Sequence, residues 1–95
     1  MLLAKVVGTV VATRKEPSLD GLKLLLVRPV NDEGQEMGAP LAAADAVGAG
    51  PDEMVLVAAG SSARQTQATD KRPVDAVVMA IVDSWSLGSA VKYKK

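Results

Sequence analysis

The apolar residues of this chain fall into short runs, and none shows the 3.6-residue repeat of a long amphipathic helix. In residues 2–13, small and apolar side chains recur at every second position, which predicts a strand. The later runs also have strand length, and residues 74–82 are rich in β-branched side chains. Strands are therefore expected at residues 2–13, 22–30, 35–44, 53–59 and 74–82.

Segments rich in Pro, Gly, Asp and Asn separate these runs and supply the turns. Residues 31–34 predict a hairpin turn. Residues 60–65 predict one helical turn, in which Ser62 and Gln65 fit a capping box. Five short strands and one helical turn indicate an all-β fold, and the nearest common architecture is a small five-stranded OB-like β-barrel.

Two of the predicted strands are apolar on both faces. The runs 53–59 and 74–82 carry apolar side chains at odd and even positions alike, whereas a lone barrel needs only its inner face to be apolar. One interpretation is that the surplus apolar face packs against a partner, most simply another copy of the chain. The alternative is that a loop or the helical turn covers it.

The size and ends of the chain indicate one small domain. We expect a barrel domain over residues 1–84, followed by a C-terminal segment, 85–95, whose basic end is a solvated tail. No apolar run approaches the roughly 20 residues of a membrane span, and the N-terminus lacks the pattern of a signal peptide. The sequence therefore predicts a cytoplasmic protein with no membrane partner.

Composition excludes several kinds of chemistry. The chain has no His and no Cys, so it has no imidazole base, thiolate nucleophile, disulfide or ordinary zinc site. Eleven basic residues balance eleven acidic ones, which argues against binding to nucleic acid through bulk charge. Trp85 and Tyr93 are the only aromatic residues. A single-stranded nucleic-acid-binding module is the alternative function that a barrel suggests, but it needs stacking aromatics in a basic groove.

The candidate catalytic and binding residues all have simpler explanations. Gly48 and Gly50 do not continue into a dinucleotide fingerprint, and a tight turn explains them better. Ser61 and Ser62 lack a histidine base, and nothing in the spacing supports a lysine base in its place. The sequence therefore predicts no catalytic residue.

Single aspartates adjoin the apolar runs. A pair of carboxylates can perform acid–base chemistry or hold a metal. Aspartates at strand ends more often accept backbone N–H bonds or pair with an arginine across an interface. We therefore expect no metal and no cofactor at these residues, which are Asp45, Asp75 and Asp83.

The order of several motifs resembles that of a known family. These are a Val-Gly-Ala-Gly turn ending at Gly50, a Gly-Ser-Ser-Ala-Arg segment ending at Arg64, and a Pro-Val-Asp-Ala run ending at Ala76. Together with the N-terminal strand and the run closing on Asp83, they resemble the EutN/CcmL family, the pentameric vertex proteins of bacterial microcompartment shells. The resemblance covers about residues 3–84.

The resemblance implies a structural protein without catalysis, assembled as a homopentamer in the shell of a cytoplasmic microcompartment. It leaves open whether that compartment is a carboxysome or a catabolic one. A layer of hexagonal tiles needs five-fold tiles at its corners in order to close, and each such ring uses two different surfaces per subunit. Hexameric shell proteins are the further partners that the resemblance implies.

The resemblance also assigns expected roles to individual residues. It places one segment at the subunit interface, toward the centre of the ring: Gly60, Ser61, Ser62, Ala63 and Arg64. In this interpretation Arg64 pairs with an acidic residue of the neighbouring subunit, either Asp45 or Asp83. The candidates for contact with hexamers lie in two exposed charged segments: Lys15 and Glu16 in one, Asn31 and Asp32 in the other.

Overall fold

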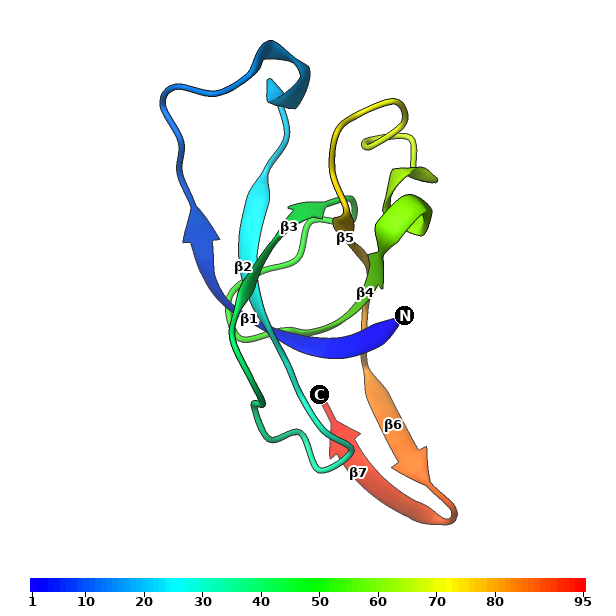
Figure 1. Cartoon of the computed structure of the whole chain (residues 1–95). Coiled ribbons are helices and arrows are strands. Elements are labelled where there is room, and N and C mark those ends of the chain that lie inside the picture. The colour runs from blue at the N-terminus through cyan, green and yellow to red at the C-terminus, as the bar shows by residue number, and fades with distance from the viewer.

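Seven β-strands and two short 3-10 helices make up the computed structural model, which describes all residues, 1–95 (Figure 1). The strands are β1 (Leu2–Val10), β2 (Leu24–Pro29), β3 (Leu41–Asp45), β4 (Met54–Ala59), β5 (Ala76–Ile81), β6 (Ser84–Leu87) and β7 (Ala90–Lys94). The helices are η1 (Pro17–Leu19) and η2 (Gly60–Arg64), and neither has the length or the hydropathy to cross a bilayer.

Five of the strands close into a barrel in the order β1-β2-β3-β5-β4, and β4 pairs again with β1. All neighbours are antiparallel except β3 and β5, which run parallel and pair only through Ala44 with Val77 and Asp45 with Val78. This is the five-stranded, OB-like barrel that the sequence predicts, and the fold class is confirmed.

The third predicted strand is too long. Only the second half of residues 35–44 joins the sheet, as β3 begins at Leu41. The first half belongs to a wide turn in which the Asn31 N–H donates to the Gln35 carbonyl at 2.9 Å. Gly38 then adopts a φ of +71°, and Pro40 has no N–H to give to a ladder. These two residues delay the start of the strand.

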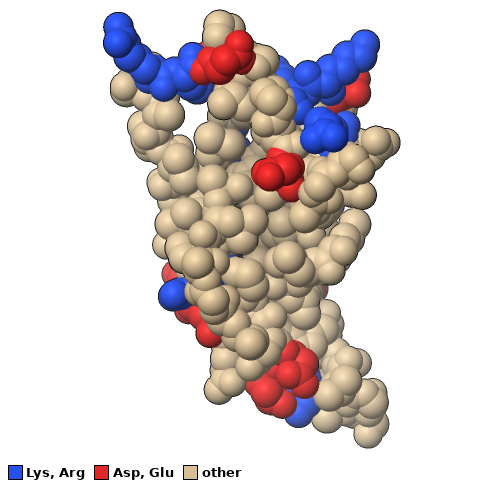
Figure 2. Space-filling view, viewed as in Figure 1, with Lys and Arg blue, Asp and Glu red and all other residues tan.

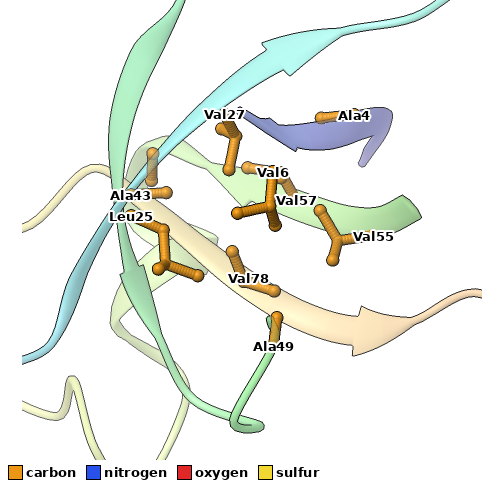
Figure 3. Packing of buried hydrophobic residues seen from close by; sticks show 10 residues of the cluster. Ala4, Val6, Leu25, Val27, Ala43, Ala49, Val55, Val57 and Val78 are labelled. Carbon is orange, nitrogen blue, oxygen red and sulfur yellow. The ribbon is translucent and has the colours of Figure 1, made fainter. Parts of the chain in front are cut away.

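The barrel interior is filled by small side chains that point toward one another (Figure 3). Leu25 is the largest of the fully buried residues. A five-stranded barrel leaves little internal space, and valine and alanine fill it without overpacking. The absence of Phe from the sequence is consistent with this narrow interior. The ten residues of this core are Ala4, Val6, Leu25, Val27, Ala43, Ala49, Val55, Val57, Ala76 and Val78.

A second, smaller core explains part of the apolar surplus on β4 and β5. Ala58 and Val77 face away from the barrel interior and pack with Ala63 of η2 and with Val74. The helical turn and the loop after it therefore cover this part of the outer face, as the alternative interpretation held. A partner surface is not needed to explain these residues.

The helical turn forms without the predicted capping box. The residue that precedes η2 is Ala59, and no side chain caps the first turn. Gly60 begins the turn with a φ of +66°, and its N–H donates to the carbonyl of Asp75 at 2.8 Å. Ser62 lies inside the turn rather than before it, so its hydroxyl is not placed to cap.

The prediction of a solvated C-terminal tail is wrong. Residues 84–94 form the hairpin β6–β7, in which Trp85 stacks on Tyr93 with ring centroids 4.7 Å apart. Trp85 Nε1 donates to the Asp32 carbonyl at 2.8 Å, and Lys92 pairs with Glu33 at 2.9 Å. The two aromatic rings and these contacts fix the hairpin against the 31–36 turn, at the lower end of the molecule in Figure 1.

The buried Thr69 hydroxyl generates a stability prediction. Its Oγ1 donates to the Ala63 carbonyl at 2.6 Å and thereby holds η2 to the following loop. Thr69→Val keeps the shape but leaves that carbonyl without its donor, so we expect a loss of roughly 1–3 kcal/mol in the free energy of unfolding. Urea unfolding at a fixed protein concentration, followed by the fluorescence of Trp85, measures it. Thr13→Val, at an exposed threonine, is the control, and an equal loss in both variants would contradict the assignment.

Candidate assembly interface

The Gly60–Arg64 segment presents two hydroxyl groups on a firmly held turn. Ser61 and Ser62 are exposed. The next residue, Ala63, is fully buried in the second core. The carbonyl of Ala63 is bound by Thr69, so the turn is anchored from beneath. Such an arrangement displays the serine side chains to a partner without requiring the turn to reorganise.

Arg64 has no acidic partner within the subunit. Its Nη1 donates to the carbonyl of Val74 at 3.3 Å, and it forms no ion pair. The side chain is exposed. The remaining N–H groups of its guanidinium are free to bind a carboxylate from outside the subunit.

A hollow of about 310 Å³ lies beside this segment. Met79 of β5 and the N-terminal Met1 supply its larger apolar side chains, and Ala58 and Ala59 of β4 form another part of its lining. Ser62 contributes a hydroxyl, and Gln65 completes the lining. The surface next to the predicted interface segment is therefore both concave and partly apolar.

Asp45 is occupied inside its own subunit. Its carboxylate accepts N–H bonds from Val47, Gly48 and Ala49 at 3.0–3.3 Å, and its side chain is only 2 % exposed. Lys23 Nζ lies 3.9 Å away. Of the two acidic residues proposed to meet Arg64 of a neighbour, Asp83 alone has a carboxylate that is exposed and unpaired.

The two glycines of the 45–50 turn differ in their conformations. Gly48 adopts a φ of +79°, which favours glycine. Gly50 does not have a positive φ, and its N–H donates instead to the Glu53 carboxylate. A Cβ at Gly50 would lie 3.2 Å from Glu53 Oε1, so a side chain there would press on that contact.

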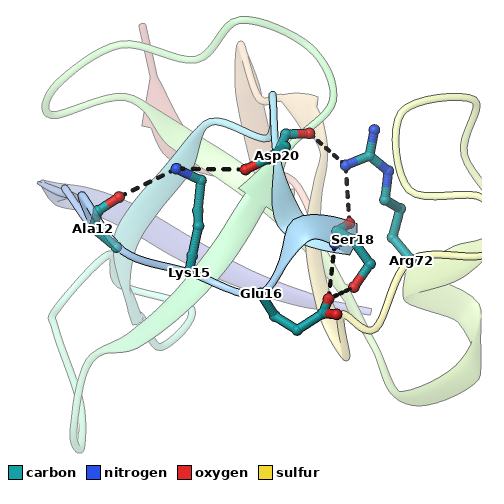
Figure 4. A network of polar contacts seen from close by, with 6 residues as sticks. All are labelled: Ala12, Lys15, Glu16, Ser18, Asp20 and Arg72. Atoms are coloured by element: carbon teal, nitrogen blue, oxygen red, sulfur yellow. Dashed lines mark hydrogen bonds and ion pairs between the residues drawn. The ribbon is translucent and has the colours of Figure 1, made fainter.

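The predicted contact residues Lys15 and Glu16 lie in a loop at one end of the barrel that is held in place by hydrogen bonds (Figure 4). Glu16 accepts hydrogen bonds from the hydroxyl and the N–H of Ser18, which lower the pKa of its carboxyl group from the ordinary value of 4.5. Arg72, from the loop before β5, donates to the carbonyls of Ser18 and Asp20 at 3.0 and 2.6 Å. Two loops far apart in sequence therefore form one unit.

Asn31 and Asp32 lie at the other end of the molecule, beside the C-terminal hairpin (Figure 1). The molecule is 46 Å long and 23 Å wide, so the two pairs of predicted contact residues do not form one patch. Figure 2 shows charged side chains gathered toward the two ends, with a largely uncharged band between them on the visible face. The Asn31 side chain accepts from the N–H groups of Glu33 and Gln35, and the Asp32 carboxylate is exposed and unpaired.

Comparison with known families identifies the chain. A family model described as ethanolamine utilisation protein EutN/carboxysome matches residues 1–83. The chain belongs to this family. The matched region ends just before β6, so it comprises the complete barrel and both 3-10 helices and leaves out the β6–β7 hairpin.

Relatives within the EutN/carboxysome family match the whole length of the chain. The carboxysome shell vertex protein CcmL of Gloeobacter violaceus is 47% identical, covering 100% of this chain and 95% of that protein. The solved structure of CcmL from Nostoc sp. PCC 7120 has a TM-score of 0.95 and 50% identity, with 100% of both chains covered. The pentameric microcompartment shell protein GrpN from Rhodospirillum rubrum has a TM-score of 0.84 and 44% identity, covering 92% of this chain and 99% of that one.

These relatives are named as structural components of shells and not as enzymes. The chain is accordingly a structural vertex protein of a bacterial microcompartment shell, located with that compartment in the cytoplasm. The side-chain geometry fits this role. Asp45 and Glu16, for example, hold a turn and a loop through hydrogen bonds to backbone N–H groups.

Sequence reasoning missed Glu53, which joins the hairpin to the barrel. Its carboxylate accepts from Lys95 Nζ at 2.6 Å and from the N–H of Gly50. The sequence does carry a signal for the hairpin, since both aromatic residues flank a Gly-Ser turn at Gly88. No sequence pattern links Glu53 to a lysine 42 positions later.

The Glu53–Lys95 contact predicts an acid-sensitive hairpin. The hydrogen bond from Lys95, followed by that from Gly50, lowers the pKa of the Glu53 carboxyl group from the ordinary value of 4.5. The contact therefore stabilises the hairpin above pH 4.5, and this stabilisation is lost as the pH falls through the lowered pKa. We expect the fluorescence of Trp85 to change in one step as the solution is acidified. Glu53→Gln should abolish this acid step.

Asp70→Asn is the control for this titration, because Asp70 is exposed and forms no ion pair. It should leave the acid step in place. A step that persists unchanged in Glu53→Gln would show that another carboxyl group holds the hairpin.

Proposed function

We propose that five copies of this chain form a closed ring that occupies a five-fold vertex of a microcompartment shell. The observation that carries the proposal is the match over the whole chain to shell vertex proteins, including one that is pentameric. A closed barrel suits the task, because a rigid subunit fixes the angle between the two contacts that it makes in a ring. No observation supports the alternative of a nucleic-acid-binding module.

We place the Gly60–Arg64 segment at the subunit contact, with the serine hydroxyls toward the centre of the ring. The exposed hydroxyls, the anchored turn and the adjoining hollow support this placement. The unpaired guanidinium of Arg64 then meets the unpaired carboxylate of Asp83 on the neighbouring subunit. We also propose that residues 1–84 suffice for the ring and that the hairpin is an addition to it.

Arg64→Ala tests this placement. Because the variant removes an exposed side chain that makes one bond of 3.3 Å within its subunit, the isolated subunit should remain folded. We expect a lower native mass at dilute concentration and a lower thermal midpoint than for the unaltered ring. Lys71→Ala, which removes an exposed unpaired cation from the next loop, is the control. An unchanged mass and midpoint for Arg64→Ala would exclude its role.

We propose that hexameric shell tiles contact the turn at residues 31–34. The Asp32 carboxylate projects without a partner, while its carbonyl is fixed by Trp85, so the charge is held on a rigid support. The 15–16 loop is less suited, because its Glu16 carboxylate is already bound to Ser18. Asp32 is therefore the residue to alter.

Co-assembly with hexameric shell proteins of a microcompartment tests the vertex function. Electron microscopy should show closed polyhedra with this chain and only open sheets or tubes without it, since hexagonal tiles alone cannot close. Asp32→Lys should leave the ring mass unchanged and reduce the number of closed shells, whereas Asp70→Lys at the other end should not. Shells that close equally well without the chain would contradict the vertex function.

A further inference from the structure

The polar attachments of the 31–34 turn to the rest of the subunit all come from the C-terminal hairpin, through Trp85 and Lys92. The other hydrogen bonds of the turn join its residues to one another or to Gln35. Such a turn keeps its own shape but can pivot where it leaves the sheet. Resting on the proposed tile contact, we infer that the hairpin β6–β7 is a buttress for this turn. It holds Asp32 where the residue meets a hexameric tile, with Trp85 as the positioning residue.

Trp85 contacts the turn with both its N–H group and its ring. Nε1 donates to the Asp32 carbonyl at 2.8 Å. A Cβ built on Gly34 would lie 3.8 Å from Cζ2 and from Cη2 of the indole, so the ring packs on the backbone of that glycine. Gly34 has a φ of +81°, which favours glycine. The indole therefore fixes the residue that carries the proposed contact and also the residue two positions after it.

Tyr93 holds the indole in this orientation. Its ring stacks on Trp85 with centroids 4.7 Å apart and 19° between the ring planes. The two residues also pair directly across the hairpin, where stacked aromatic side chains stabilise a two-stranded sheet. The indole is therefore packed between the turn and the second strand of the hairpin.

A β-bulge gives the turn its second attachment. Trp85 pairs with Tyr93 and Ser86 pairs with Val91, so Lys92 is an extra residue of β7 with no partner across the hairpin. A bulge re-aims a side chain, and Lys92 Nζ lies 2.9 Å from the Glu33 carboxylate. This ion pair compensates the charge of Glu33. The exposed Asp32 carboxylate remains as the free charge of the turn.

The hairpin can support the turn because its own base is fixed. The Lys95 N–H donates to the Asp83 carbonyl at 2.8 Å, which closes the hairpin at its two ends. Lys95 Nζ donates to the carboxylate of Glu53, the residue before β4, at 2.6 Å. The hairpin is thus joined to the barrel at its base and to the turn through Trp85 and Lys92. Such a link transmits the position of the barrel to the turn.

Trp85→Phe tests the buttress in the assembled protein. The variant keeps an aromatic ring beside Tyr93 but loses the Nε1 donor and the part of the ring that contacts Gly34. Two measurements apply: amide hydrogen exchange at residues 31–35, and affinity for an immobilised layer of hexameric shell protein. We expect exchange to become roughly two- to tenfold faster and binding to weaken by a similar factor, at an unchanged native mass. Tyr93→Phe, which keeps the Nε1 donor, is the control and should change neither.

A double-variant cycle separates positioning from a general structural role. Asp32→Asn removes the charge that the buttress is inferred to place. Adding Trp85→Phe to Asp32→Asn should then weaken tile binding less than Trp85→Phe does in the unaltered chain. Equal losses in the two backgrounds would overturn the inference. If Asp32→Asn alone weakens binding and Trp85→Phe does not, the inference is overturned and the tile contact stands. If Asp32→Asn binds as tightly as the unaltered chain, the tile contact is wrong and the inference falls with it.

A matched pair of lysine variants gives a measurement that does not depend on Trp85. Lys92→Gln and Lys94→Gln make the same change of charge on the same strand, but only Lys92 pairs with the turn. Lys94 is exposed and forms no ion pair. Amide exchange at residues 31–35 should become faster for Lys92→Gln alone. Equal exchange in both variants would overturn the inference.

Discussion

The closure of the barrel depends on the carboxylate of Asp45. β3 and β5 meet through only two residue pairs, the fewest at any seam of the barrel. At its end Asp45 accepts three consecutive N–H groups and so folds the chain into a turn that inserts Ala49 into the core. Without this turn the barrel would be open where β3 and β5 diverge.

A rigid barrel gives a five-fold ring its geometry. Because each subunit must hold its two contacts at a fixed angle, flexibility between them would allow rings of other sizes or open chains. The contact that we propose at Gly60–Arg64 lies on a turn anchored by Thr69. The hairpin, held by Trp85 and by Lys95 outside this frame, does not take part in closing the barrel.

The sequence predicted the barrel well, and its assignment of interface residues stays a prediction. Period-two alternation in β1 and the apolar runs of β4 and β5 gave their positions, because local pattern and burial agree there. The start of β3 depends on Gly38 and Pro40 together with the turn at Asn31, and period-two alternation does not reveal this combination. The occupation of Asp45 is local, because its carboxylate accepts from the N–H groups two to four residues on. The docking of the hairpin depends instead on contacts between distant segments, such as Glu53 with Lys95, which no local pattern encodes.

The native mass of the unaltered protein, measured by mass spectrometry over a concentration series, tests the central claim most directly. The account predicts one dominant species with about five times the 9.8 kDa mass of the chain, persisting on dilution. A single chain at all concentrations, or a ladder of masses with no preference for five, would contradict it.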